Sequence, residues 1–328
     1  MLTRNIFITG GAGYVGAVLV PKLLSLGYSV SVYDLMIYGE EVLPVHPNLR
    51  IIKGDLRDQV LLLKSLAGHD TVIHLACISN DPSFELNPNL GKSINLDAFR
   101  PLVVNSLRVG VERFIYASSS SVYGVKQEKN VVEDISLEPL TDYSRYKVEC
   151  EQILLEYQSS DFTTITLRPA TVCGYSPRQR LDVVVNILTN LAFHNRKITV
   201  FGGNQLRPNI HIADMVDSYV MLLTAPKEKV SGQTYNVGWE NRSVQEIAET
   251  VRSVIGDDVE LIHTPTDDNR SYHISSKKIK MDLGFEASFS INDAITELRE
   301  AFEMGKLMNS LTDEKYFNIK RMQNLELS

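Results

Sequence analysis

The first half of the chain alternates short apolar runs with longer segments in which apolar residues recur every three or four positions. The apolar runs predict strands at 5–9, 28–33, 49–53, 71–75, 113–117 and 163–168. The longer segments predict helices at 14–26, 59–67, 90–109 and 143–157. Strands that alternate with helices are typical of an α/β fold with a parallel, doubly wound sheet.

Beyond residue 170 the alternation becomes weaker. Helices are predicted at 182–194, 212–224, 244–255, 275–283 and 291–306, and strands at 197–201, 234–237 and 259–262. A chain of 328 residues usually divides into more than one packed unit. We therefore predict a first domain of residues 1–173, to which about 203–226 return, and a smaller mixed α/β C-terminal lobe of 174–202 and 227–328. No role is indicated for the polar tail from 307.

Right-handed crossovers place the carboxyl end of every parallel strand, and the loop that follows it, on one edge of the sheet. The residues expected at this edge are Gly10, Asp34, Asp55, Ala76, Ser118 and Pro169. Gly10, Gly13 and Gly16 lie between the first strand and the first helix, a spacing typical of a turn that holds a dinucleotide pyrophosphate. Asp34, at the end of the next strand, is placed to accept a hydrogen bond from a ribose hydroxyl.

Composition narrows the classes of partner. Hydrophobic residues make up 44% and charged residues 22% of the chain, as in globular proteins, and no apolar run could span a bilayer. A net charge of −7 argues against nucleic-acid binding. The three cysteines have no spacing typical of a disulfide framework or zinc site, so no metal is expected. Without a signal peptide, we expect a cytoplasmic protein with no membrane partner.

Candidate chemistry lies on the helix predicted at 143–157. Tyr143 and Lys147 are four residues apart and therefore share one face of that helix. A nearby ammonium group stabilises a phenolate, which makes a tyrosine a usable acid/base. A run of four serines, 118–121, directly follows the fifth strand and offers hydroxyls at the same edge.

In these residues the chain resembles the extended short-chain dehydrogenase/reductases that act on nucleotide sugars, of the UDP-galactose 4-epimerase and sugar 4,6-dehydratase type. The resemblance covers nearly the whole chain and implies a Rossmann-type fold, a nucleotide-diphosphate sugar as substrate and a role in polysaccharide biosynthesis. It is carried by residues 10–16, Asp34, 54–56, 74–76, 118–124, Tyr143, Lys147, 167–169 and 207–214.

The resemblance also implies the cofactor. NAD is favoured over NADP because no arginine follows Asp34 until Arg50. In such proteins the glycines wrap the pyrophosphate, Asp55 and Leu56 flank adenine, and Lys147 binds the nicotinamide ribose. The residues expected to bind NAD are Gly10, Gly13, Tyr14, Val15, Gly16, Asp34, Asp55, Leu56, Leu75, Ala76, Asn95, Ser118, Tyr143, Lys147 and Pro169.

For catalysis, the resemblance implies Tyr143 as acid/base, Lys147 as its partner and Ser119 as the hydroxyl that hydrogen-bonds the reacting oxygen. The 4,6-dehydratases carry an acidic pair after that hydroxyl, where this chain has Ser120 and Ser121. A serine cannot protonate a departing hydroxyl as a carboxylic acid can, so dehydration is not favoured. The substrate contacts expected are Ser119, Ser120, Arg178, Arg180, Arg207 and Arg270, the arginines because a guanidinium suits a diphosphate.

Two activities could use the same Tyr143, Lys147 and Ser119. The first is a nucleotide-sugar epimerase that works through C4 oxidation to a 4-keto-sugar; the second is a net C4-dehydrogenase or 4-ketoreductase. The run 177–182 resembles the branch that contains GDP-heptose C4-dehydrogenases, which favours the second. A non-catalytic dinucleotide sensor is disfavoured by the intact Tyr143 and Lys147. The family also implies a homodimer formed through helices at about 90–109 and 143–158. Leu102, Val103, Leu154 and Leu155 are apolar enough to be buried in that contact, but they could equally face the sheet.

Overall fold

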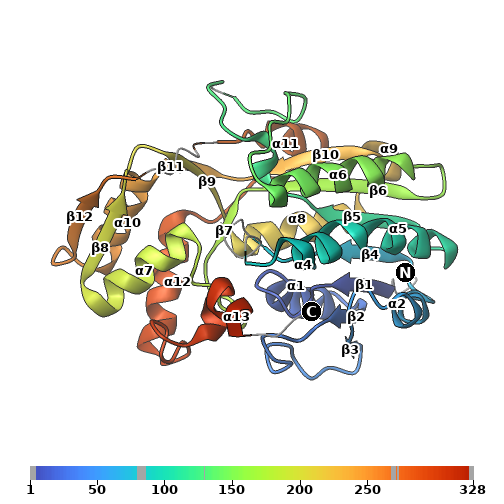
Figure 1. Cartoon of the computed structure of the whole chain (residues 1–328), viewed down its shortest axis with the longest axis horizontal. Coiled ribbons are helices and arrows are strands. Elements are labelled where there is room, and N and C mark those ends of the chain that lie inside the picture. The colour runs from blue at the N-terminus through green and yellow to red at the C-terminus, as the bar shows by residue number, and fades with distance from the viewer. Residues whose placement is uncertain (1–4, 80–85, 129, 267–270, 272, 325–328) are drawn as a thin grey trace.

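The computed structural model describes residues 5–79, 86–128, 130–266, 271 and 273–324. Its larger lobe is built on a seven-stranded sheet in the order β10-β6-β5-β4-β1-β2-β3, in which all neighbouring pairs run parallel (Figure 1). The strands are β1 (Asn5–Thr9), β2 (Ser29–Asp34), β3 (Leu49–Lys53), β4 (Thr71–His74), β5 (Arg113–Ala117), β6 (Thr163–Pro169) and β10 (Gln233–Val237). The predicted α/β, doubly wound fold is confirmed.

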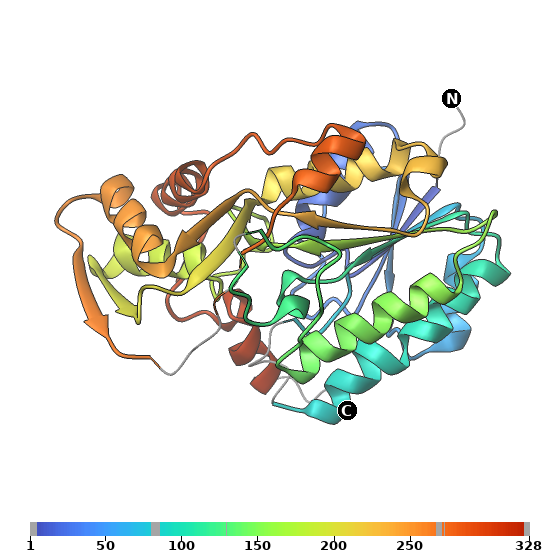
Figure 2. The same ribbon diagram turned by 90° about the horizontal axis from the view of Figure 1, so that it is seen from above.

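Helices cover both faces of this sheet, as the view from above shows (Figure 2). One layer holds α2 (Gln59–Leu66), α4 (Pro88–Lys92), the π-helical turn η1 (Ser93–Asp97), α5 (Phe99–Arg108) and α6 (Asp142–Glu156). The other holds α1 (Gly16–Ser25), α8 (Ile212–Thr224), α9 (Lys227–Val230) and α11 (Lys277–Leu283). Alternate residues of β1 enter the two cores, because successive strand side chains point to opposite faces: Phe7 packs on the α5 side, and Ile6 and Ile8 on the α1 side.

The smaller lobe contains two small sheets and a helical layer. One sheet has the order β11-β9-β7, from β7 (Thr171–Cys173), β9 (Leu206–His211) and β11 (Glu240–Ser243). The other pairs β8 (Lys197–Phe201) in parallel with β12 (Glu260–Thr264). The helices are α7 (Val184–Asn195), α10 (Val244–Ile255) and α12 (Ile291–Glu303), whose apolar faces share one core with β8. None of the described helices combines the length and apolar character that a membrane crossing requires.

Several boundaries differ from the prediction. The predicted helix at 90–109 is divided into α4, η1 and α5. The domain boundary at 227 is wrong, because β10 adds to the large sheet beside β6, with Gln233 opposite Ile165. A five-residue strand carries no signal of which sheet it will join, since partner choice depends on distant backbone. Strands β7, β9 and β11 were not predicted, being short and without clear alternation.

The helices proposed as a dimer contact bury most of their apolar residues against the sheet. Leu102 and Val103 of α5 and Leu154 of α6 are buried in the core that also holds Phe7. Leu155 is 57% exposed and Val104 is 42% exposed. Leu102, Val103 and Leu154 are therefore core residues that face the sheet, which is the second of the two alternatives predicted for them.

The tail from residue 307 folds back between the two lobes (Figure 1). It contains the 3₁₀ turn η3 (Glu314–Tyr316) and the short helix α13 (Asn318–Asn324). Tyr316 is buried beside Leu181 and Phe302, and its carbonyl oxygen accepts a hydrogen bond from the amide of Leu181. This anchoring holds α13 against the carboxyl edge of the large sheet.

Candidate active site

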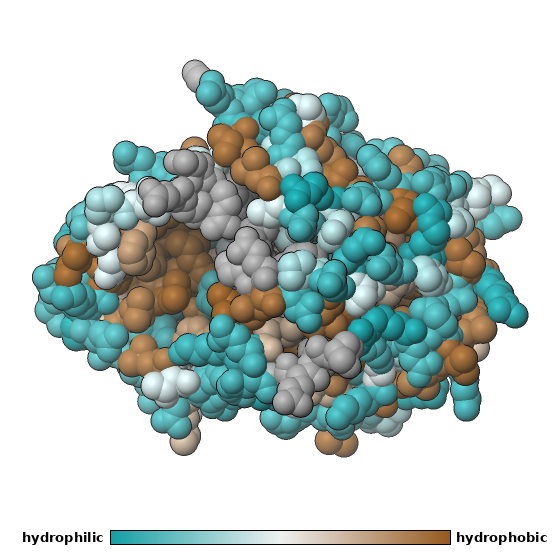
Figure 3. Space-filling model, in the orientation of Figure 1, coloured by the Kyte–Doolittle hydropathy of each residue, from teal (hydrophilic) through white to brown (hydrophobic). Residues whose placement is uncertain are grey.

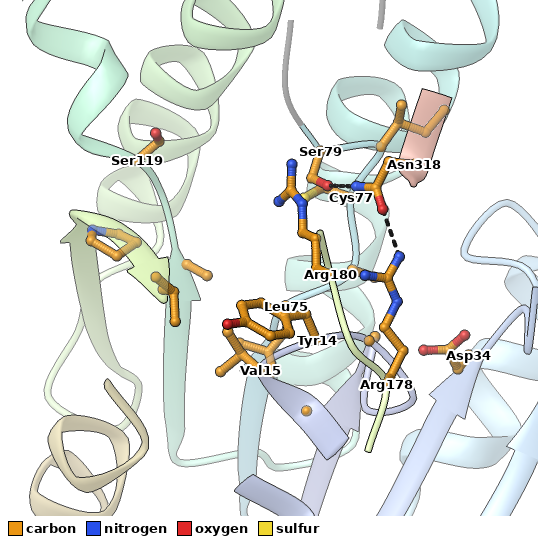
Figure 4. Close-up of a pocket in the computed structure, with 18 of the residues that line it drawn as sticks. Tyr14, Val15, Asp34, Leu75, Cys77, Ser79, Ser119, Arg178, Arg180 and Asn318 are labelled. Carbon is orange, nitrogen blue, oxygen red and sulfur yellow. Dashed lines mark hydrogen bonds between the residues drawn. The ribbon is translucent and has the colours of Figure 1, made fainter. Parts of the chain in front are cut away.

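The carboxyl edge of the sheet opens into a pocket of about 400 Å³ between the lobes (Figure 4). Most residues expected at a dinucleotide site line it. They are Gly10, Gly13, Tyr14, Val15, Gly16, Asp34, Asp55, Leu56, Leu75, Ala76, Ser118, Tyr143 and Pro169. Ser119, Ser120, Arg178 and Arg180, expected on the substrate side, also line it.

The glycine turn is shaped by two close approaches of backbone. Gly10 has φ +74°, and a Cβ there would lie 2.5 Å from the backbone nitrogen of Ala76. A Cβ on Gly16 would lie 2.4 Å from the carbonyl oxygen of Gly11. Helix α1 then begins without a side-chain cap at Val15 and without an acidic residue in its first turn. The amides of Ala17 and Val18 already donate to the carbonyl oxygens of Gly13 and Val15, so a ligand would bind the amides that precede them. The helix dipole favours an anion there.

We expect Gly10→Ala to abolish dinucleotide binding and to destabilise the fold, because the added methyl group overlaps the chain at Ala76. Gly68→Ala is the matched control: Gly68 has φ +84°, with nothing within 4 Å of an added Cβ. In the control, the free energy of unfolding should fall only by the conformational cost of a left-handed alanine, roughly 1–2 kcal/mol. Isothermal calorimetry and chemical denaturation of both variants test this. Equal losses in the two variants would contradict the close-approach argument.

Asp34 lies at the end of β2 beside this turn. Its Oδ2 accepts from the amide of Ala12 at 3.0 Å and its Oδ1 from the amide of Met36 at 2.8 Å. Burial raises the pKa of this carboxyl, and the two amide hydrogen bonds offset only part of that rise. The side chain is thus fixed in one orientation at the pocket wall, as recognition of a ribose requires.

Asp55 and Leu56 follow β3 and line the same end of the pocket. The Asp55 carboxylate is already bound by Arg57, whose Nη2 lies 2.6 Å and Nε 3.0 Å from its oxygens. Burial acts to raise the pKa of Asp55, but the Arg57 hydrogen bonds outweigh it and lower that pKa. The Asp55 and Leu56 carbonyl oxygens also already accept, from the Tyr33 hydroxyl at 2.7 Å and from Gln59 Nε2 at 2.9 Å. The Leu56 side chain lines the pocket and could contact a base.

Asn95 does not line the pocket, contrary to the expected cofactor contact. Its Oδ1 accepts from the amide of Ile78 at 2.8 Å, and its Nδ2 donates to the Ile78 carbonyl oxygen at 3.0 Å. Both polar ends of the buried side chain are used to hold the loop after β4. Asn95 therefore shapes the pocket wall through Ile78, which is itself a lining residue.

The candidate acid/base, Tyr143, lies in the first turn of α6. The helix begins at Thr141, whose hydroxyl accepts from the amide of Ser144 in a capping box. Lys147 is buried one turn further on, where Nζ donates to the Ala117 carbonyl oxygen at 2.7 Å and lies 5.7 Å from the centroid of the Tyr143 ring. Lys147 is not among the residues that line the pocket, so its predicted contact with the nicotinamide ribose and its action on Tyr143 stay predictions.

Ser119 lies two residues beyond the end of β5. Its Oγ accepts from the amide of Ser121 at 3.1 Å and lies 2.9 Å from the Ser121 hydroxyl, which makes Ser119 the cap of the 3₁₀ turn η2 (Ser120–Tyr123). Ser118 lines the pocket, but its hydroxyl donates to Glu151 and is turned toward the protein interior. Only part of the serine run therefore presents hydroxyls to a substrate.

A buried ion pair supports this serine segment from below. Arg168 on β6 binds Glu151 on α6, with Nη2 2.7 Å and Nε 3.0 Å from its carboxylate oxygens. Arg168 Nη1 also donates to the hydroxyl of Tyr123 at 2.8 Å. Both charged side chains are less than a tenth exposed. Helix α6, strand β6 and the serine segment are thus held in one arrangement.

The four arginines predicted to bind substrate differ in their position relative to the pocket. Arg178 and Arg180 both line the pocket, Arg178 buried and Arg180 partly buried, and Arg180 Nε binds Asp182 Oδ1 at 2.5 Å. Arg207 lies on β9, outside the pocket lining, and its Nη1 donates to the Leu206 carbonyl oxygen. Arg270 lies outside the described residues, so its predicted substrate contact stays a prediction.

The contribution of the tail to the pocket was not predicted from the sequence. Asn318 and Met322 of α13 line the pocket, together with Ile37 and Tyr38 of the loop after β2. Figure 4 shows Asn318 between Ser79 and Arg178, hydrogen-bonded to both. The only available signal was a weak helical tendency near the C-terminus, which does not indicate a site.

The pocket fits a dinucleotide on structural grounds. A glycine cradle, uncapped helix amides and a fixed Asp34 lie along one wall. Facing them is Arg178, whose Nε and Nη1 are buried without a hydrogen-bond partner among the residues described here. A buried donor without a partner is costly in a folded protein, unless a ligand supplies the acceptor.

Comparison with known proteins agrees with this geometry. The model of the NAD dependent epimerase/dehydratase family matches residues 6–238. The uncharacterized protein y4nG of Sinorhizobium fredii is 32% identical over 239 residues, which cover 72% of this chain but only 57% of that protein. The dTDP-glucose 4,6-dehydratase of Streptomyces niveus is 26% identical, covering 90% of this chain and 92% of its own.

Among solved structures, MoeE5 in complex with UDP-glucuronic acid and NAD is similar over the whole fold. Its TM-score is 0.81 at 26% sequence identity, with 92% of this chain and 99% of that chain covered. The family match spans more than half of the chain and includes both the glycine turn and the Tyr143–Lys147 pair. The chain therefore belongs to the NAD-dependent epimerase/dehydratase family, and its cofactor is NAD.

Proposed function

We propose that this protein is a nucleotide-sugar epimerase that oxidises the sugar at C4 to a 4-keto intermediate and reduces it again on the other face. The observation that carries this proposal is the distribution of carboxylates. Among the described lining residues, the only acids are Asp34 and Asp55, and both lie at the ends of β2 and β3, away from Tyr143. Oxidation and reduction at one carbon need no acid beyond the tyrosine, whereas elimination of water does.

The residues around the reacting centre support an oxidation step. The Tyr143 phenolic oxygen takes the proton of the sugar hydroxyl and returns it in the reverse direction. The Lys147 ammonium, on the same helix face, stabilises the phenolate form of Tyr143 that accepts this proton. Ser119 hydrogen-bonds the reacting oxygen. NAD, when bound, supplies the hydride acceptor and donor.

Dehydration, the activity of some relatives, is disfavoured by the contacts of the remaining acids. Ser120 and Ser121 stand where an acidic pair would be needed. Glu151, the carboxylate nearest in sequence to Tyr143 on the inner face of α6, is already bound by Arg168 and Ser118. A carboxylate held by a buried guanidinium is a poor proton donor, because the ion pair favours its charged form.

The nucleotide part of the substrate is proposed to lie against the smaller lobe. Figure 3 shows a hollow with a largely hydrophobic floor over this lobe, in the region of α7 and α10. Arg180, at the lobe boundary, is oriented by Asp182 and is proposed to bind the substrate diphosphate. These features support a nucleotide-diphosphate sugar but do not select the base or the sugar.

A net C4-dehydrogenase or 4-ketoreductase is the second candidate. It would use the same Tyr143, Lys147 and Ser119. It is favoured by the run 177–182, which resembles that of GDP-heptose C4-dehydrogenases and lies at the pocket through Arg178 and Arg180. The two activities differ only in whether the hydride returns to the same sugar.

The test is product analysis by chromatographic separation of isomers and mass spectrometry after incubation with UDP-, GDP-, CDP- and dTDP-sugars. We expect an isomer of unchanged mass, with no accumulation of NADH. Loss of two hydrogens from the sugar with NADH formation would reject the epimerase in favour of the dehydrogenase. A sugar product lighter by one water would reject both the epimerase and the dehydrogenase, and would indicate a dehydratase.

A further inference from the structure

We propose that Arg178 binds the diphosphate of NAD, and that the C-terminal helix α13 holds it in position through Asn318. The two residues would form a clamp that closes over the cofactor on the side opposite the glycine turn. The inference rests on NAD as the cofactor and is independent of whether the reaction is an epimerisation or a net oxidation.

Arg178 has the features of a ligand-binding arginine. It is only 4% exposed, and its guanidinium lies 3.5 Å from the centroid of the Tyr38 ring. Its Nη2 donates to Asn318 Oδ1 at 2.6 Å. Nε and Nη1 have no partner among the described residues. One edge of the guanidinium is thus held by protein, while donors remain for an acceptor that the protein does not provide.

The position of Arg178 favours a diphosphate over other acceptors. Figure 4 shows its guanidinium on the pocket side, between Asn318 and Asp34. Its loop is tied to the glycine turn, because Ser176 Oγ donates to the Tyr14 carbonyl oxygen at 2.8 Å and the Tyr14 hydroxyl donates to the Gly174 carbonyl oxygen at 2.7 Å. A group bound at the start of α1 therefore lies beneath this loop.

A 2′-phosphate, as in NADP, is the competing anion for these donors. It would have to lie against Asp34, whose carboxylate faces the same part of the pocket (Figure 4). Like charges at such short range repel, so the Asp34 carboxylate disfavours a second anion there. The diphosphate avoids this contact because it binds at the glycine turn, beyond the ribose.

Asn318 is the centre of the clamp. Its backbone amide donates to Asp182 Oδ2 at 2.7 Å, and its Nδ2 donates to Ser79 Oγ at 2.7 Å. The Tyr38 hydroxyl donates to Oδ1 at 2.9 Å, beside Arg178. These contacts join four segments that are far apart in the sequence, and each of them borders the cofactor pocket. Because Asn318 has partners in each of these segments, it fixes their positions relative to one another.

The energetic consequence separates a binding role from a structural one. Burial lowers the pKa of Arg178, which reflects the cost of keeping its charge away from water. An unpaired buried charge destabilises the protein until a counter-ion arrives. Arg178→Met should therefore leave the nucleotide-free protein as stable as before, or more stable, while it weakens NAD binding.

The experiment measures dissociation constants by calorimetry on the full-length protein after removal of co-purified nucleotide, with NAD, ADP, NADP and adenosine as ligands. Arg178→Met should weaken NAD and ADP by about 10- to 100-fold, the range for a hydrogen bond to a charged group, and leave adenosine unchanged. Asn318→Ala should weaken NAD less, and should add little in the Arg178→Met background because both act through one guanidinium. Lys320→Met, which removes an exposed cation of α13, is the control and should change nothing.

Four results would overturn the proposal. Unchanged NAD affinity in Arg178→Met would show that Arg178 does not contact the NAD diphosphate. An equal loss for adenosine, or a lower unfolding temperature without nucleotide, would make Arg178 a structural residue. A larger loss for NADP than for NAD would assign its donors to a 2′-phosphate. Arg178→Lys, which keeps a charge at this position, should retain part of the affinity if the proposal is correct.

Discussion

Tyr143→Phe should lower the turnover number by about 10²- to 10⁴-fold, the usual contribution of a positioned acid/base, while NAD binding is retained. The substitution removes only the phenolic oxygen and keeps the ring that lines the pocket. Lys147 keeps its hydrogen bond to the Ala117 carbonyl oxygen, so the wall behind the ring should not change. Steady-state kinetics on the sugar identified by product analysis, together with NAD calorimetry, measure both quantities.

Tyr146→Phe is the control for this variant, since it makes the same chemical change three residues further along α6 and outside the pocket lining. It should retain the activity of the unaltered protein. Undiminished sugar oxidation in Tyr143→Phe would remove Tyr143 from catalysis. A parallel loss of NAD affinity would instead indicate that the hydroxyl serves binding.

Glu151→Leu should lower the free energy of unfolding by about 3–5 kcal/mol, because it leaves the Arg168 guanidinium buried without a counter-charge. It also removes the acceptor of the Ser118 hydroxyl, next to Ser119. We therefore expect activity to fall as well, even at temperatures at which the variant is folded. Chemical denaturation followed by circular dichroism measures the first effect.

The same helix provides a matched control in the exposed pair between Arg100 and Glu156, whose side chains are 46% and 56% exposed. Glu156→Leu should cost no more than about 1 kcal/mol, as surface ion pairs do. In the double variant Glu151→Leu/Arg168→Met, most of the stability should return, because no lone charge remains buried. If Glu151→Leu costs no more than Glu156→Leu, the buried pair does not hold α6 to the sheet.

The large sheet and the glycine turn could be predicted from the sequence because their signals are local. The alternation that sends Phe7 to one face and Ile8 to the other depends only on strand geometry. The Tyr143–Lys147 pair is likewise a property of one helix. The strand order then brought Gly10, Asp34 and Tyr143 to one edge, as right-handed crossovers require.

Predictions that depended on which segments meet were less accurate. Asn95 was expected at the cofactor, but its side chain is turned to the backbone of Ile78. Arg207 and Arg178 looked alike as candidate cations, and only Arg178 reaches the pocket. Strand β10 joined the large sheet and not the smaller lobe.

By itself, the sequence determined the α/β class, the glycine turn, the place of Asp34 and the shared helix face of Tyr143 and Lys147, since each depends on residues within one or two neighbouring elements. Only the tertiary structure decided that Asn318 meets Arg178, 140 residues away along the chain. It likewise decided that the tail closes the cofactor pocket. Such contacts arise from the packing of both lobes against the sheet edge, and no periodicity within a single segment encodes them.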